Sequence, residues 1–93
     1  MSVILTGHID VPEERRAAVA AALPEHVRLT RAEPGCLFFE VEPDGAVSGR
    51  YRVSERFADR TAFEAHQARV RGSDWGRITE GIPRSYRITD EGA

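Results

Sequence analysis

The chain has 93 residues, of which 41% are hydrophobic and 30% are charged, and its net charge is −2. This length predicts one domain over residues 1–93, and the composition is typical of a globular protein. The 13 basic residues are scattered along the chain, which argues against a nucleic-acid binder. No apolar run approaches the roughly 20 residues that span a bilayer, and no signal peptide is visible, so we expect a cytoplasmic protein without membrane contact.

The first part of the chain predicts a strand, a helix and a second strand. Residues 3–10 read as a strand with a period of two, both of whose faces are at least partly apolar. The run Asp10-Val11-Pro12 offers a capping carboxylate and an early proline, so a helix should start there. Pro24 is expected to kink or restart this helix, and Pro34 marks its end. Residues 36–42 then form the second strand.

The second part predicts a strand, a helix and a last strand. A polar turn precedes residues 50–57, which form a hairpin with the preceding strand. Asp59 or Thr61 is expected to cap the next helix. A short turn follows around residues 75–79. The last strand covers residues 83–89, and its leading proline suggests an edge position.

This order of elements predicts an α+β domain. Two strand–helix–strand halves joined by a hairpin form the ferredoxin-like split β-α-β arrangement, with both helices on one face of an antiparallel sheet. The other face would remain open.

Alternation along the hairpin separates these two faces. If Glu42 lies opposite Arg50, the same register sets Glu40 against Arg52. The open face then carries a mixed set of side chains, namely Phe38, Glu40, Glu42, Arg50, Arg52, Ser54 and Arg56. The face beneath the helices carries Leu37, Phe39, Val41, Tyr51, Val53, Glu55 and Phe57. A mixed open face is either solvated or forms a symmetric dimer, and we expect a homodimer.

The strongest candidates for chemistry are His66 and Glu55. His66 lies on the buried stripe of the second helix, and Glu55 points to the helix-facing side of its strand. A buried carboxylate needs a partner, and an imidazole within reach would supply one. The pair is therefore either an acid/base pair lining a pocket or a satisfied core pair that fixes the helix on the sheet.

Four aromatic side chains are candidates for binding a substrate. Trp75 follows a helix break and either covers a pocket mouth or plugs the edge of the core. His26 lies near an apolar helical stripe, and Phe63 shares the buried stripe of His66. Tyr51, like Tyr86, is an amphipathic strand residue suited to a pocket wall. No flavin, nucleotide or metal motif appears, so we expect no cofactor and no metal.

Three motifs together resemble one known family. They are the run from Glu33 to Leu37 (EPGCL) together with the Phe39-Glu40-Val41 that follows it, the run from Ser54 to Asp59 (SERFAD) and the spaced set Ala62-Phe63-x-x-His66. In this order they resemble the antibiotic biosynthesis monooxygenase domains, including their quinol-monooxygenase-like members. The resemblance implies a dimeric α+β barrel with a pocket for a small aromatic molecule and oxygen insertion without flavin or metal.

Three hypotheses about function follow from the residues and the resemblance. The first is a cofactor-independent monooxygenase acting on a small aromatic quinol-type or polyketide-like compound. The second is a small-molecule binding protein without turnover. The third is an isomerase that uses the same acid/base pair.

Overall fold

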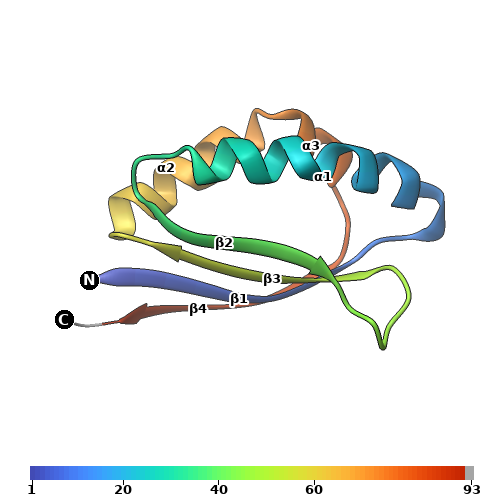
Figure 1. The fold of residues 1–93 in the computed structure, drawn as a ribbon, viewed down its shortest axis with the longest axis horizontal. Coiled ribbons are helices and arrows are strands. Elements are labelled where there is room, and N and C mark those ends of the chain that lie inside the picture. The colour runs from blue at the N-terminus through green and yellow to red at the C-terminus, as the bar shows by residue number, and fades with distance from the viewer. Residues whose placement is uncertain (92–93) are drawn as a thin grey trace.

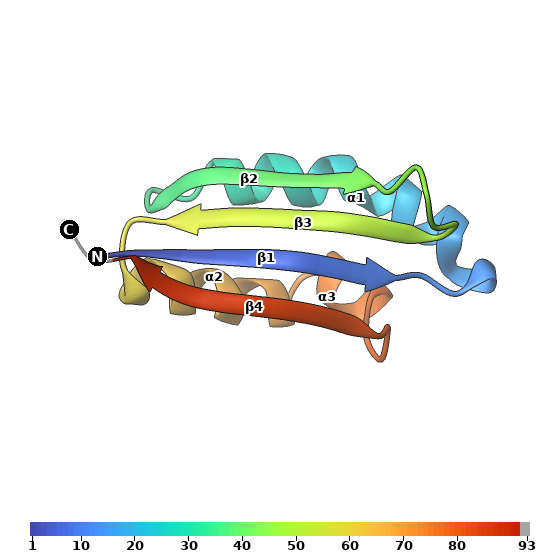
Figure 2. The ribbon, with the colours of Figure 1, turned by 90° about the horizontal axis from the view of Figure 1, so that it is seen from below.

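The computed structural model describes residues 1–91. Its elements in chain order are β1 (Ser2–Asp10), the 3-10 turn η1 (Glu13–Arg15), α1 (Arg16–Arg31), β2 (Cys36–Pro43), β3 (Arg50–Phe57), α2 (Arg60–Arg71), α3 (Asp74–Ile78) and β4 (Arg84–Glu91). The strands form one antiparallel sheet in the order β2-β3-β1-β4. All three α-helices lie on one face of the sheet (Figures 1 and 2), which confirms the predicted α+β, ferredoxin-like arrangement. Within residues 1–91, no helix is long and apolar enough to cross a membrane.

The helix α1 differs from the prediction at its start, and it continues through Pro24 without a restart. Asp10 is the last residue of β1 and pairs with Arg50, whose Nε lies 2.7 Å from its Oδ1, so it does not cap the helix. Pro24 does not restart α1, which continues to Arg31. Pro24 is exposed, as is Ala20, whose carbonyl loses its helical donor. Water can therefore replace the missing hydrogen bond.

The α2–α3 segment is held by two side-chain caps. Asp59 caps α2 by accepting a hydrogen bond from the Ala62 amide at 2.8 Å. The predicted turn around Trp75 is the one-turn helix α3, and Ser73 caps it. A Cβ at Gly76 would lie 2.1 Å from the carbonyl oxygen of Val70. Only glycine allows this close approach between α3 and the end of α2.

Two apolar clusters form the core between the helices and the sheet. The first contains Val3, Leu5, Val53, Phe57 and Phe63. The second contains Ile9, Val11, Val19, Trp75 and Ile82. Each cluster is in contact with one imidazole. The ring of His66 lies 4.8 Å from that of Phe57 in the first cluster, and the ring of His26 lies 4.5 Å from that of Trp75 in the second. Polar side chains are thus buried where the two clusters meet.

The hairpin register differs from the prediction in two ways. Glu42 lies opposite Arg52 rather than Arg50, a shift of two residues that preserves the assignment of most side chains to their faces. A bulge between Cys36 and Phe38 then changes the alternation. Cys36 packs against the core, whereas Leu37 is 59% exposed. The prediction that Leu37 lies beneath the helices is therefore wrong.

Candidate functional site

Three elements bring ionisable side chains together beneath the helices. Glu33 follows α1, His66 lies in α2 and Glu55 lies in β3. The Nδ1 atom of His66 is 2.9 Å from Oε1 of Glu33, while Nε2 faces Oε1 of Glu55 at 3.9 Å. Arg69 donates from Nε to Glu33 at 2.7 Å. The result is a continuous series of Arg69, Glu33, His66 and Glu55.

Glu55 is the least satisfied member of this series. Its side chain is 8% exposed, and Oε1 has no hydrogen-bond partner among the described residues. Burial, together with the negative charge of Glu33, raises the pKa of Glu55 to about 7. The carboxyl group therefore changes its charge close to neutral pH, which suits a general base or acid.

His66 is oriented by Glu33. Burial lowers the pKa of His66, and the adjacent Glu33 carboxylate opposes that effect only in part. A carboxylate accepts hydrogen bonds, so the neutral ring carries its proton on Nδ1 and donates it to Glu33. The lone pair of Nε2 is then directed toward Glu55, where it can accept a proton or a hydrogen bond.

His26 and Trp75 form a flat stack beside this series. Their rings are 4.5 Å apart at an interplanar angle of 3°, and the ring of His26 is 6.4 Å from that of His66. Burial, with the nearby His66, lowers the pKa of His26 to about 3, so its ring is neutral at physiological pH. Nδ1 of His26 is buried without a hydrogen-bond partner within residues 1–91.

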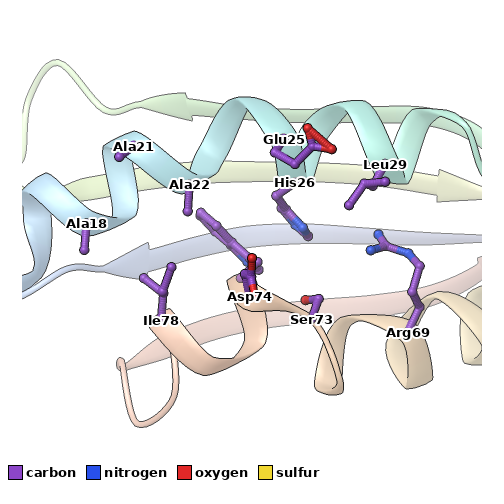
Figure 3. A pocket seen from close by; sticks show the side chains of 11 residues that line it. Ala18, Ala21, Ala22, Glu25, His26, Leu29, Arg69, Ser73, Asp74 and Ile78 are labelled. Carbon is purple, nitrogen blue, oxygen red and sulfur yellow. The ribbon is translucent and has the colours of Figure 1, made fainter.

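Two hollows meet at the stacked pair. A small cavity of about 40 Å³ lies between helices and sheet, and its lining includes Glu55, His66 and both stacked rings. It is partly open to the surface, because the exposed Arg84 and Tyr86 of β4 also line it. A groove of about 490 Å³ lies on the outer side, between α1 and the α2–α3 segment. Figure 3 shows His26 and Leu29 of α1 across this groove from Arg69 and Ser73. His26 and Trp75 line both hollows, so they form the wall between them.

The structure brings together four of the six predicted site residues. His66, Glu55, His26 and Trp75 all line the small cavity. Phe63 packs in the first core cluster and Tyr51 against the second, and neither lines the cavity or the groove. A direct hydrogen bond between His66 and Glu55 is not formed, because 3.9 Å is too long.

Sequence reasoning missed Glu33 and Arg69 as members of the site. Glu33 was visible as part of a motif and Arg69 as a helical residue one turn after His66, but the pairing crosses from the end of α1 to α2. The i,i+3 spacing of His66 and Arg69 on α2 was the available signal. Among residues 1–91, no group of three or more His, Cys, Asp or Glu side chains could hold a metal ion.

Comparisons with solved structures support this fold. Rv0793 from Mycobacterium tuberculosis has a TM-score of 0.76 at 21% identity, covering 100% of this chain and 97% of that one. PA3566 from Pseudomonas aeruginosa has a TM-score of 0.77 at 21% identity, with coverages of 99% and 95%. A candidate antibiotic biosynthesis monooxygenase from Caulobacter crescentus has a TM-score of 0.78 at 17% identity, with coverages of 99% and 91%. At these identities, the likeness establishes the fold alone.

The sequence itself establishes the family. No curated protein matches the chain at a significant level. The model of the antibiotic biosynthesis monooxygenase family, however, matches residues 2–71, which include β1 to β3 and α2 and hold Glu33, Glu55 and His66. The chain therefore belongs to the antibiotic biosynthesis monooxygenase family.

Proposed function

We propose that the protein is a cofactor-independent monooxygenase that oxidises a small aromatic hydroxyl compound of the quinol or polyketide type. The observation that carries the proposal is Glu55, a buried carboxyl group with an unpartnered oxygen and a pKa near 7. It faces the cavity beside Nε2 of His66. Membership of the family supports the reaction class.

Glu55 acts as the general base in this proposal. Its carboxylate takes the proton from the substrate hydroxyl, and the electron-rich phenolate that results can transfer an electron to dioxygen. His66 presents Nε2 to the same hydroxyl and can share the proton. Glu33 and Arg69 keep the imidazole in the required tautomer and orientation.

The reaction balances without an external reductant. One hydroquinone and one dioxygen give one hydroxyquinone and one water. The substrate supplies the electrons that reduce the second oxygen atom, so one oxygen atom enters the product and the other leaves as water. The role assigned to the protein is to bind the substrate, to deprotonate it and to exclude bulk water from the anion.

Oxygen uptake with a panel of quinols tests this proposal. We expect one dioxygen consumed per hydroxyquinone formed, with kcat/KM rising with pH through about 7 as Glu55 loses its proton. Glu64→Gln, which changes an exposed carboxylate on α2, is the control and should leave the rate unchanged. Tight quinol binding without oxygen uptake would instead favour the binding protein, and product of unchanged mass would favour the isomerase.

The homodimer is also a proposal, and its interface would be the open face of the sheet. This face carries a shallow depression lined by apolar and polar side chains, among them Ile4, Leu37, Phe38 and Arg56. Phe38 is 47% exposed and Leu37 is 59% exposed. A partner that covers both would remove a substantial apolar area from water.

We expect Phe38→Glu to convert the dimer into a monomer, because it places an unpaired charge in the buried interface. Light scattering at micromolar concentration provides the measurement. Val47→Glu, in the exposed hairpin loop, is the control and should remain dimeric. A wild-type protein that is already monomeric at this concentration would rule out the interface.

A further inference from the structure

The floor of the small cavity has no side chain at Gly7. Leu5 and Ile9 of β1 line the cavity, and Gly7 lies between them. Gly7 pairs with Val53 of β3 on one side and with Tyr86 of β4 on the other. A Cβ at Gly7 would lie 2.9 Å from Cδ1 of Tyr86. The tyrosine ring therefore occupies space that a side chain at position 7 would need.

The hydroxyl of Tyr86 is the sheltered end of an exposed residue. Tyr86 is 37% exposed, yet burial is the main cause that raises the pKa of its hydroxyl to about 12. The charge of Glu55 adds to this rise in pKa, and the charge of Arg84 opposes it. Within residues 1–91, the hydroxyl forms no hydrogen bond. The exposed part of Tyr86 is therefore its ring, and the hydroxyl lies within electrostatic reach of Glu55.

The register of the sheet places Glu55 and Tyr86 diagonally across β1. Glu55 pairs with Leu5, and Tyr86 pairs with Gly7, so both side chains rise from the helix-facing side of the sheet. No side chain at Gly7 separates them. Oε1 of Glu55 is buried and has no hydrogen-bond partner among the described residues. An oxygen atom that enters this gap thus meets a proton acceptor on one side and a hydrogen-bond donor on the other.

We propose that Tyr86 is a further catalytic residue, which donates a hydrogen bond to the substrate oxygen from which Glu55 takes the proton. The proposal rests on the proposed function and adds to it the group that stabilises the phenolate. The O–H bond of the substrate breaks, the proton bonds to the Glu55 carboxylate, and the electron pair stays on the phenolate oxygen.

Tyr86 keeps its own proton throughout this step. Its pKa of about 12 lies far above neutral pH, so the hydroxyl remains a donor. A hydrogen bond to a charged oxygen is stronger than one to a neutral oxygen. The bond from Tyr86 therefore strengthens as the phenolate forms, and it favours the anion that reacts with dioxygen.

The open side of the cavity leaves room for the body of the substrate. The cavity, at about 40 Å³, holds a hydroxyl group but not an aromatic ring. Gln67 and Val70 of α2 and Arg84 and Tyr86 of β4 line it, and none of the four is buried. Ile88, which is 45% exposed, follows Tyr86 on the same side of β4. The ring of the substrate thus lies along β4 with its hydroxyl directed inward, and bulky groups beside that hydroxyl are excluded.

A phenol that resists oxidation can test the role of Tyr86. 4-Nitrophenol is the probe, because its nitro group withdraws electrons from the ring and its phenolate absorbs visible light. The spectrum of the bound probe at neutral pH gives the ratio of phenolate to phenol. We expect Tyr86→Phe to lower this ratio about tenfold, because a hydrogen bond to a charged oxygen is lost. The substitution keeps the aromatic ring and leaves Glu55, His66 and Arg84 in place.

Thr89→Val is the matched control. It also removes a hydroxyl group from β4, but on the open face of the sheet, opposite Ile4. The ratio of phenolate to phenol should not change in this variant. A ratio that is the same in Tyr86→Phe and in the wild type overturns the inference. An equal fall in Thr89→Val, or a wild-type protein that does not bind 4-nitrophenol at millimolar concentration, overturns it as well.

Turnover of a quinol separates this inference from the monooxygenase proposal. Tyr86→Phe should lower kcat about tenfold and change KM little, because the hydrogen bond gains its strength only as charge develops. An unchanged kcat would overturn the role of Tyr86 and leave the monooxygenase proposal standing. If the wild type takes up no oxygen with any quinol while Tyr86→Phe still lowers the phenolate ratio, the monooxygenase proposal fails and the donor role of Tyr86 is supported.

Discussion

Replacing Glu55 with glutamine is expected to stabilise the folded protein by about 3 kcal/mol at pH 8 and to change its stability little at pH 4. The reason is the difference between the pKa of Glu55 in the folded protein, about 7, and its ordinary value of 4.5. Each unit of difference corresponds to about 1.4 kcal/mol. Because the folded pKa is raised, the stability that wild-type Glu55 contributes is complete below about pH 4.5 and is lost as the pH rises through 7.

Urea denaturation of both proteins from pH 4 to 8 would measure this effect. The difference between variant and wild type is the useful quantity, because the lowered pKa of His26 makes its own contribution rise with pH in both proteins. That contribution cancels in the difference. Glu64→Gln is the exposed control, for which we expect no trend with pH. A stability difference for Glu55→Gln that is constant across this range would show that the buried carboxylate is not destabilised by its surroundings.

His66→Ala is expected to reduce turnover by about 10²–10⁴-fold, the usual contribution of a positioned acid or base. The same substitution removes the hydrogen bond to Glu33 and should lower the free energy of unfolding by about 1–3 kcal/mol. Turnover must be measured on a variant that is folded and has the same oligomeric state as the wild type. Under those conditions, the loss of rate reflects the loss of the imidazole.

A core substitution of similar cost separates the two roles of His66. Val3→Ala empties space in the first core cluster, away from the cavity, and should lower stability without changing the rate per folded molecule. If folded His66→Ala binds the quinol and oxidises it at the wild-type rate, His66 is a core residue that holds α2 on the sheet. Glu55 would then have to act alone.

The order of the elements was predictable because each carries its own periodicity or cap. Alternation marks the strands, and the capping carboxylate of Asp59 marks α2. The bulge at Cys36 and Phe38 has no such local signal, because it depends on how β2 matches its neighbour β3. Pro24 carries a strong local signal for a helix break, yet α1 continues through it. Pro24 is exposed, so water can replace the hydrogen bond that its missing N–H cannot donate.

The site was predictable only in part because its contacts are formed between layers. The buried sides of α2 and β3 placed His66 and Glu55 on facing surfaces. The direct partner of the imidazole is nevertheless Glu33, which lies in the connection after α1, where no periodicity indicates the direction of a side chain. The stack of His26 on Trp75 likewise depends on the angle at which α3 follows α2, and that angle requires the absence of a side chain at Gly76.

The stacked pair also has an optical consequence. Trp75 is the only tryptophan in the chain, so all indole emission and all indole circular dichroism come from the ring that rests on His26. Contact with a fixed imidazole face gives that ring an asymmetric surrounding. The unlabelled protein thus carries a chromophore whose spectrum depends on this one contact and on no other indole.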